Sequence, residues 1–221
     1  GLSQLLRGSP HRFKNYLDGP GNVHPVFGNV VSGIIQDHKL HIWVSTFGYG
    51  LNRLEPDGTF TRFVHPVDTV GNQENFIYTL VEDSEGPFWL STSVGLVSFD
   101  PGSGEFKRYT IDQLRSAHIF GIAPDQNNDL WLSTGIGLVK FSPKTHTFVR
   151  YDEKDGMPFN EFFSDFHRNS RGNLLVGGLD GFTEFSPEGI SKTSHPPEIA
   201  ITNFSVLSKE VSSTVLPPGE I

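Results

Sequence analysis

Apolar residues in this chain fall into short segments of four to seven positions, and turn-forming residues separate these segments. The stretch from Phe76 to Tyr109 shows the pattern clearly, because Asp83 to Gly86 and Asp100 to Gly104 interrupt it with residues that favour tight turns. Phe106 to Tyr109 alternates aromatic and basic residues, as expected for a strand with one face in solvent. No stretch of ten or more residues has the 3.6-residue apolar period of an amphipathic helix. The pattern predicts antiparallel β-strands joined by short turns.

A motif centred on tryptophan repeats along the chain at nearly constant spacing. Trp43, Trp89 and Trp131 are each followed by an apolar residue, Ser and Thr, with a Gly-Leu pair shortly after. The three tryptophans are 46 and 42 positions apart, and Leu175 occupies the equivalent position 44 residues further on. Repeats of this length with several short strands are typical of β-propeller blades. We therefore predict an all-β fold, a β-propeller with four-stranded antiparallel blades.

Each repeat divides into four predicted strands, except that the last contains three. The predicted strands are 30–36, 42–46, 51–54 and 60–63 in the first repeat, 76–82, 88–92, 96–99 and 106–109 in the second, 119–124, 130–134, 138–141 and 148–151 in the third, and 162–167, 174–177 and 182–185 in the fourth. The fourth repeat meets Ser186-Pro187 where its outer strand would start, so we expect this copy to be incomplete.

The repeats set the expected domain boundaries. Residues 1–22 match the second half of a preceding blade, and four repeats follow at about 23–66, 67–112, 113–154 and 155–192. Residues 193–221 are expected to hold a stiff Pro-Pro linker and the start of a following β-sandwich domain. Because an open repeat array must be capped or closed, we expect a fragment of about four to five blades from a larger propeller.

Composition limits the classes of partner. The 221 residues carry 17 Lys and Arg against 25 Asp and Glu, a formal net charge of −8, and the longest basic cluster is the pair Lys107-Arg108. This balance disfavours nucleic acid, whose phosphates attract basic surfaces. Apolar runs are far shorter than the ~20 residues of a membrane span, so this segment is not expected to cross a bilayer. The absence of cysteine excludes disulfides and thiolate chemistry.

The sequence contains no motif for catalysis or for a cofactor. Asp125 to Asp129 begins like a calcium loop, but Leu130 stands where the loop needs Gly and Ile136 where it needs Glu. Gly-rich phosphate loops, His-Glu-x-x-His and Gly-x-Ser-x-Gly elements are absent from the sequence. We therefore expect no catalytic residue, no cofactor and no metal in this segment.

The residues that carry the repeat resemble the two-component regulator propeller repeat. The match is clearest from Glu82 to Tyr109, with Asp before a Gly-containing turn, then Trp-Leu-Ser-Thr, Gly-Leu, Phe-Asp-Pro and a closing aromatic residue. Tyr151 to Asn160 resembles an element that enters a late blade of this family. Pro196 to Thr202 resembles the entry to the small β-sandwich called the three-Y domain. The fourth repeat departs from the pattern, with Leu175 in place of Trp.

The resemblance implies the periplasmic part of an inner-membrane signalling protein. In this family a transmembrane helix and a histidine kinase or diguanylate cyclase module commonly follow the propeller. Related propellers in hybrid sensors recognise oligosaccharides. The implied partners are therefore a small-molecule or oligosaccharide ligand and the downstream domains of the same chain.

The position of a residue in the repeat helps to distinguish residues that pack the blades from residues that could bind a ligand. The three tryptophans occupy the same place in every repeat, so we interpret them as packing between blades. Ligand-binding residues should instead depart from the repeat, on the face formed by the second-to-third strand turns and the connections between repeats. The candidates there are His24, Tyr49, His65, Gln73, Arg115, His118, Asn160, Glu161 and Asp180. Their donors, acceptors and one aromatic ring suit a polar ligand.

Three functions follow from these observations. The first is a binding module that recognises an extracellular ligand and passes a rigid-body change to the following domain. The second is an enzyme similar to streptogramin lyase, which uses magnesium and a histidine general base and would need His24, His65, His118 and His167 to converge on the axis. The third is an interaction module that only joins two copies of the receptor in a homodimer.

Overall fold

The computed structural model describes residues 1–6, 8, 12–16, 26–66, 75–84, 86–109, 118–190, 204–206 and 209–211. The chain forms two units, Gly1–Ser191 and Lys192–Ile221. In the second unit, β18 (Phe204–Val206) pairs with β19 (Lys209–Val211). The Pro-Pro linker expected after residue 192 lies outside the described residues, and the domain expected after it stays a prediction.

The first unit consists of antiparallel sheets that follow one another along the chain. A two-stranded sheet, β1 (Leu2–Leu5) and β2 (Phe13–Tyr16), comes first. Blade 1 contains β3 (Val31–Gln36), β4 (Ile42–Thr46), β5 (Gly50–Leu54) and β6 (Phe60–Phe63). Blade 2 contains β7 (Ile77–Glu82), β8 (Phe88–Thr92), β9 (Gly95–Phe99) and β10 (Phe106–Tyr109). Blade 3 contains β11 (Ile119–Pro124), β12 (Leu130–Thr134), β13 (Gly137–Ser142) and β14 (Thr147–Tyr151). Blade 4 contains β15 (Phe162–Arg168), β16 (Leu174–Gly178) and β17 (Gly181–Phe185).

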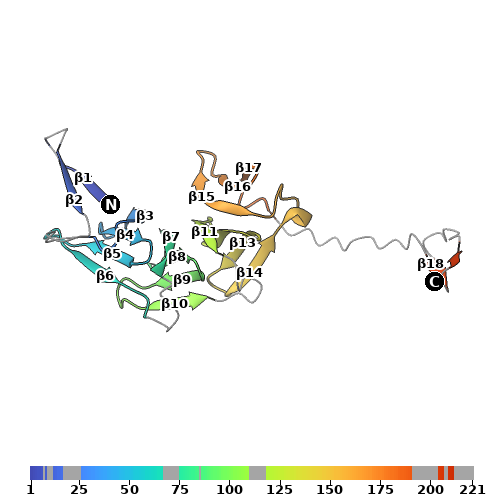
Figure 1. The fold of residues 1–221 in the computed structure, drawn as a ribbon, viewed down its shortest axis with the longest axis horizontal. Helices are drawn as coiled ribbons and strands as arrows, with labels where there is room; N and C mark the ends of the chain where they lie inside the picture. Colours follow the sequence, from blue (N-terminus) through green and yellow to red (C-terminus); the bar gives the residue numbers. More distant parts are fainter. Residues whose placement is uncertain are drawn as a thin grey trace. The chain divides into compact units, whose positions relative to one another are not determined.

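The blades follow an arc, with the first strand of each blade on its inner side (Figure 1). These inner strands, β3, β7, β11 and β15, contact one another in sequence, whereas β6, β10 and β14 lie at the periphery. The fold class predicted from the sequence is confirmed. Because each blade is a meander, its first-to-second and third-to-fourth turns lie on one face, here called the turn face. Its second-to-third turn and the connections between blades lie on the opposite face, here called the loop face.

The tryptophans pack one blade against the next, as the sequence predicts. All three side chains are buried. The ring of Trp43 in β4 lies 5.6 Å from that of Phe99 in β9, measured between centroids. Trp131 in β12 repeats this contact with Phe185 in β17 at 4.9 Å. Each second strand therefore contributes its largest apolar side chain to the core of the following blade.

The indole nitrogen of each of the first two tryptophans is held by an aspartate in the turn of the same blade. Nε1 of Trp43 donates to Oδ2 of Asp37 at 2.9 Å, and Nε1 of Trp89 donates to Oδ2 of Asp83 at 2.6 Å. The other oxygen of Asp37 accepts from the backbone nitrogens of Lys39 and His41, at 2.9 and 2.7 Å. One carboxylate therefore closes the turn and satisfies a buried indole.

Blade 3 replaces this hydrogen bond with an ion pair. Asp125 still closes its turn through the backbone nitrogen of Asp129, at 3.0 Å. Its Oδ2, however, lies 2.8 Å from Nζ of Lys140, and the buried Nε1 of Trp131 has no hydrogen-bond partner. Burial lowers the pKa of Lys140, but its hydrogen bonds to the two aspartates raise that pKa above the usual value. The lysine has displaced the indole as the partner of Asp125.

This difference predicts unequal effects of the same substitution. Trp43→Phe leaves the Asp37 carboxylate without a buried donor, whereas Trp131→Phe removes an indole nitrogen that is already unpaired. Both substitutions remove similar volume from a buried site. We expect Trp43→Phe to lower the free energy of unfolding by about 1 to 2 kcal/mol more than Trp131→Phe does. Denaturant unfolding of the two variants checks this, and equal losses would contradict it.

The Asp37 turn also predicts sensitivity to acid. Burial raises the pKa of Asp37, but hydrogen bonds from Trp43 and His41 outweigh burial, and the pKa lies below its usual value. A lowered folded pKa gives a stability contribution that is present above the unfolded pKa of about 3.9 and is lost as the pH falls through the folded pKa. We expect Asp37→Asn to show a smaller loss of unfolding free energy than the wild type across this range. Chemical denaturation at a series of acidic pH values measures both slopes.

Candidate functional site

The inner strands carry β-bulges at equivalent positions near the loop face. In β7 the ladder with β8 passes from Ile77 to Thr79, so Tyr78 is an extra residue without a partner. Phe120 is the corresponding extra residue of β11, and Ser32 is that of β3. A bulge re-aims the side chain of its extra residue and often lies beside a functional site. In blades 2 and 3 this extra residue is aromatic.

Aromatic side chains at this level touch one another from blade 1 to blade 4. The ring of Tyr78 lies 5.5 Å from Phe47 and 5.6 Å from Phe120, and Phe120 lies 5.3 Å from Phe163 at the start of β15. Phe47 also packs edge to face on Phe76, at 4.7 Å. We call this set the aromatic band; it consists of Phe47, Phe76, Tyr78, His118, Phe120 and Phe163. Phe163 is 45% exposed, so part of the band faces solvent.

A hydrogen bond next to the band spans a whole blade. Oγ1 of Thr79 in β7 donates to Oδ2 of Asp165 in β15 at 2.9 Å, although β11 lies between these strands in sequence. The contact passes Gly121, where a Cβ atom would lie 2.6 Å from Cα of Asp165. The glycine therefore permits a close approach of β15 to β11. The Thr79–Asp165 hydrogen bond and this close approach together set the spacing of the rings of Tyr78, Phe120 and Phe163.

The structure brings two of the sequence-predicted residues to this part of the loop face. His118 belongs to the aromatic band, with its ring 6.3 Å from that of Tyr78. Tyr49, in the turn between β4 and β5, packs beside Gly28 and under the guanidinium of Arg62. The sequence candidates His24, Gln73 and Arg115 lie outside the described residues.

The other candidates have different surroundings. The His65 ring packs against Phe106 of β10, with 5.5 Å between the ring centroids. His118 packs against a different ring, that of Tyr78. Oδ1 of Asn160 accepts from the backbone nitrogen of Glu153 at 3.0 Å, which places Asn160 in the turn after β14 around the short 3-10 helix Glu153–Asp155. Glu161 and Asp180 are exposed in blade 4. Across the described ranges, no group of three His, Asp or Glu side chains is arranged to hold a metal ion.

Sequence reasoning missed most of the aromatic band. Tyr78, Phe120 and Phe163 share the second position of their inner strands, so a search for residues that depart from the repeat excludes them. A usable signal was present, because a small residue follows the aromatic one in β7 and β11, as Thr79 and Gly121. A large residue followed by a small one at the start of a strand is compatible with a bulge.

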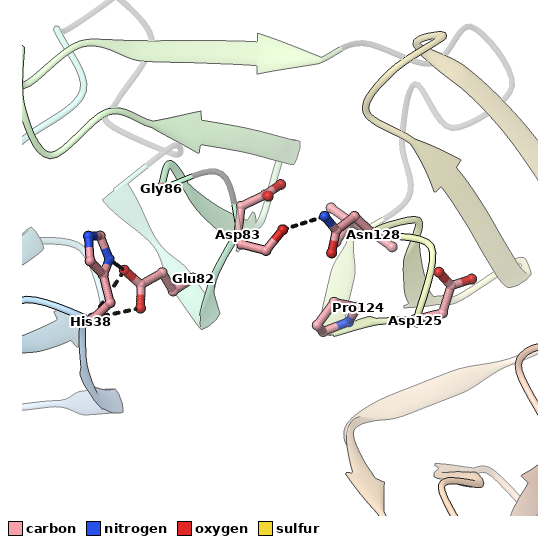
Figure 2. A pocket seen from close by; sticks show the side chains of 9 residues that line it. His38, Glu82, Asp83, Gly86, Pro124, Asp125 and Asn128 are labelled. Carbon is pink, nitrogen blue, oxygen red and sulfur yellow. Dashed lines mark hydrogen bonds and ion pairs between the residues drawn. The ribbon is translucent and has the colours of Figure 1, made fainter.

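The turn face has a pocket of its own between blades 1, 2 and 3 (Figure 2). Its volume is about 400 Å³, and it is lined by His38, Glu82, Asp83, Ser84, Gly86, Pro124, Asp125, Asn128 and Leu130. Its three carboxylates are engaged within the protein. Glu82 lies 2.5 Å from Nδ1 of His38, Asp83 accepts from Trp89, and Asp125 pairs with Lys140. These contacts stabilise the blades and occupy the carboxylates of the turn-face pocket.

Side chains around this pocket also bridge neighbouring blades at a constant sequence separation. His38 pairs with Glu82, 44 residues further on, and Asn128 donates to Ser84 over the same separation. Arg168 donates to the carbonyl oxygen of Pro124, which is again 44 residues away. Figure 2 shows the first two bridges. Polar contacts on the turn face therefore join neighbouring blades.

Comparison with known proteins agrees with this fold. No protein-family model matches the chain, and no curated protein matches it. Among solved structures, the chain is similar to the extracellular domain of BT3049 from B. thetaiotaomicron, which is described as a hybrid two-component system. The two are 25% identical, with a TM-score of 0.72 and 93% of this chain covered. The corresponding domain of BT4673 from the same organism is 24% identical, with a TM-score of 0.63 over 73% of this chain. These likenesses confirm the resemblance to sensor propellers of two-component systems.

The chain is much shorter than these domains. It spans 28% of the BT3049 chain and 22% of the BT4673 chain. The virginiamycin B lyase of Staphylococcus aureus is also similar, at 19% identity and a TM-score of 0.53, over 74% of this chain and 58% of the lyase. That likeness shows the fold alone. In the ranges that the structure describes, no helix has the length and apolar character needed to cross a membrane.

The close approach at Gly121 predicts a position-specific effect of an added methyl group. Gly121→Ala would place Cβ against the backbone of Asp165 and would push β15 away from β11. We expect a loss of about 1 to 3 kcal/mol in unfolding free energy. Gly135→Ala is the matched control, because its Cβ would meet only a ring atom of Phe163 at 4.0 Å. Equal stability of the two variants in thermal and denaturant unfolding would show that the strands are not tightly packed at Gly121.

Proposed function

We propose that this chain is the ligand-binding part of a bacterial sensor that lies in the periplasm, and that the loop face binds an oligosaccharide. The similarity to extracellular domains of hybrid two-component systems supports the sensor role. The aromatic band supports the choice of ligand and is the single observation on which the proposal rests.

The band suits saccharides because of the shape and chemistry of its exposed surface. Sugar rings have apolar faces of C–H groups that pack on aromatic faces, and hydroxyl groups at their edges that need hydrogen-bond partners. Tyr78, Phe120 and Phe163 are spaced one blade apart along the inner strands. A ligand of several rings could therefore contact blades 2, 3 and 4 at once. Asp165 and the hydroxyl of Tyr78 offer polar groups next to the rings.

Binding across several blades provides a route for the signal. The inner strands pack directly on one another, and the Thr79–Asp165 hydrogen bond joins blade 2 to blade 4. A ligand that prefers one relative orientation of these blades would shift the population toward it. We propose that this change passes to downstream domains of the same chain and from there to a kinase or cyclase module.

The lyase alternative receives less support. It needs histidines and carboxylates to converge, whereas His65 packs on Phe106 and His118 packs in the aromatic band. Among the described residues, no group of three His, Asp or Glu side chains is arranged to hold a metal ion. The region is therefore proposed to bind its ligand without turnover.

Substitutions in the band test the proposal. Phe163→Ala and Phe120→Ala remove rings that would stack on the ligand, and we expect each to weaken oligosaccharide binding by about tenfold. Because Phe163 is 45% exposed, its substitution should leave the unfolding temperature nearly unchanged. The measurement is binding of the chain to an array of short oligosaccharides, followed by titration calorimetry on those that bind.

A substitution on the opposite face serves as the control. Ser84→Ala lies in the turn-face pocket and should leave binding unchanged. The proposal fails if the wild-type chain binds no saccharide on the array, or if binding is lost in Ser84→Ala and kept in both phenylalanine variants.

A further inference from the structure

We propose that Arg62 binds a carboxylate of the ligand, so that the oligosaccharide recognised at the loop face carries uronic acid. This inference rests on the proposed function, because it names the chemical class of the ligand for the same face. The evidence for it is the set of contacts that the Arg62 side chain makes.

The Arg62 guanidinium contacts two aromatic rings. Its guanidinium carbon is 5.4 Å from the ring centroid of Phe27 and 5.4 Å from that of Tyr49. Its Nε donates to the carbonyl oxygen of Tyr49 at 2.9 Å. Arg62 and Tyr49 are exposed, so the arginine is fixed in position while it remains accessible. Because Nε is engaged with the Tyr49 carbonyl oxygen, the two terminal nitrogens are the groups that can turn outward.

Comparison with blade 3 shows a different arrangement at the equivalent position. Arg150 occupies the same position of the outer strand in blade 3, and its terminal nitrogen lies 3.3 Å from Oδ2 of Asp152. Its charge is therefore balanced within the protein. In the part of the chain that the structure describes, Arg62 has no carboxylate within ion-pair distance. A positive charge with no ion-pair partner among the described residues is suited to a partner from outside.

The arginine adjoins the aromatic band. Tyr49 is two residues from Phe47, and a Cβ on the intervening Gly48 would lie 3.4 Å from the ring of Phe76. Tyr49 is held in place by Gly28, which has a φ of +88° and where a Cβ would lie 2.7 Å from the tyrosine ring. The surface from Arg62 through Tyr49 to Phe76 and Phe47 is thus continuous. A saccharide on the band would place one of its rings near Arg62.

The chemistry of guanidinium selects a planar acidic group. Its N–H groups form a flat fork that matches the two oxygens of a carboxylate. The contacts with Phe27 and Tyr49 and the hydrogen bond at Nε restrain this fork, so less side-chain entropy remains to be lost on binding. The protein as a whole has a net charge of −8, so a local positive group is needed to offset repulsion of an anionic ligand. Arg62 meets this need.

The test compares matched ligands and matched variants. The probes are oligosaccharides that contain uronic acid and the same oligosaccharides after reduction of their carboxyl groups, titrated into the full chain. We expect the reduced forms to bind about ten- to a hundredfold more weakly than the acidic forms. Arg62→Gln should abolish this preference, and Arg62→Lys should restore only part of it, because lysine lacks the fork. Added salt should weaken binding of the acidic forms alone.

Two controls separate the site from general charge effects. Arg108→Gln removes the same charge at the equivalent position of blade 2 and should keep the preference for acidic ligands. Should Arg62→Gln unfold, the comparison of acidic and reduced ligands on the wild-type chain, with its salt dependence, decides the question by itself. Equal binding of both ligand forms by the wild type would overturn the role of Arg62.

The failure of this inference differs from the failure of the proposed function. If neutral oligosaccharides bind and Phe163→Ala weakens them while Arg62→Gln does not, the aromatic band is the binding site and the acidic ligand is wrong. If neither acidic nor neutral oligosaccharides bind, the proposed function itself is wrong. If acidic ligands bind, with loss in both Arg62→Gln and Phe163→Ala, both proposals are supported.

Discussion

The hydrogen bond from a buried tryptophan to the aspartate of its own turn links the two levels on which these blades are organised. The aspartate closes the backbone of the turn at Asp37, while the indole it holds packs into the following blade at Phe99. The hydrogen bond satisfies both groups, since a buried indole nitrogen or a buried carboxylate without a partner is unfavourable. Blade 3 shows how far the arrangement can vary: Lys140 takes the carboxylate, and Trp131 keeps its packing without its hydrogen bond.

The two faces of the blades differ in how their polar groups are engaged. On the turn face, the carboxylates of the pocket between blades 1, 2 and 3 are paired inside the protein, and side chains such as His38 reach the next blade. On the loop face, rings are partly exposed, and Arg62 has no ion-pair partner among the described residues. The volume of a pocket does not report this difference. The engagement of its polar groups is the more informative property.

Much of the fold follows from the sequence, because a period of two within strands and a tryptophan at the same place in three of the four repeats leave few alternatives. The site is harder for three physical reasons. The bulge at Tyr78 changes the direction of a side chain without changing the local pattern. The replacement of an indole by Lys140 depends on which of two donors lies nearer to Asp125. The contact between Phe27 and Arg62 joins residues 35 positions apart, and no pattern in either segment indicates the other as its partner.

The bulges of the inner strands also bear on how such repeats diverge after duplication. The extra residue is outside the hydrogen-bonded ladder, so backbone pairing with the next strand does not determine which side chain it carries. The same geometric position holds Ser32, Tyr78 and Phe120 in three successive blades, while the core around it keeps its tryptophans. Each copied blade thus has a position that accepts a small polar or a large aromatic side chain while the strand ladder and the buried tryptophans stay the same. Duplicated blades can therefore come to differ along their inner edge without a change in their core.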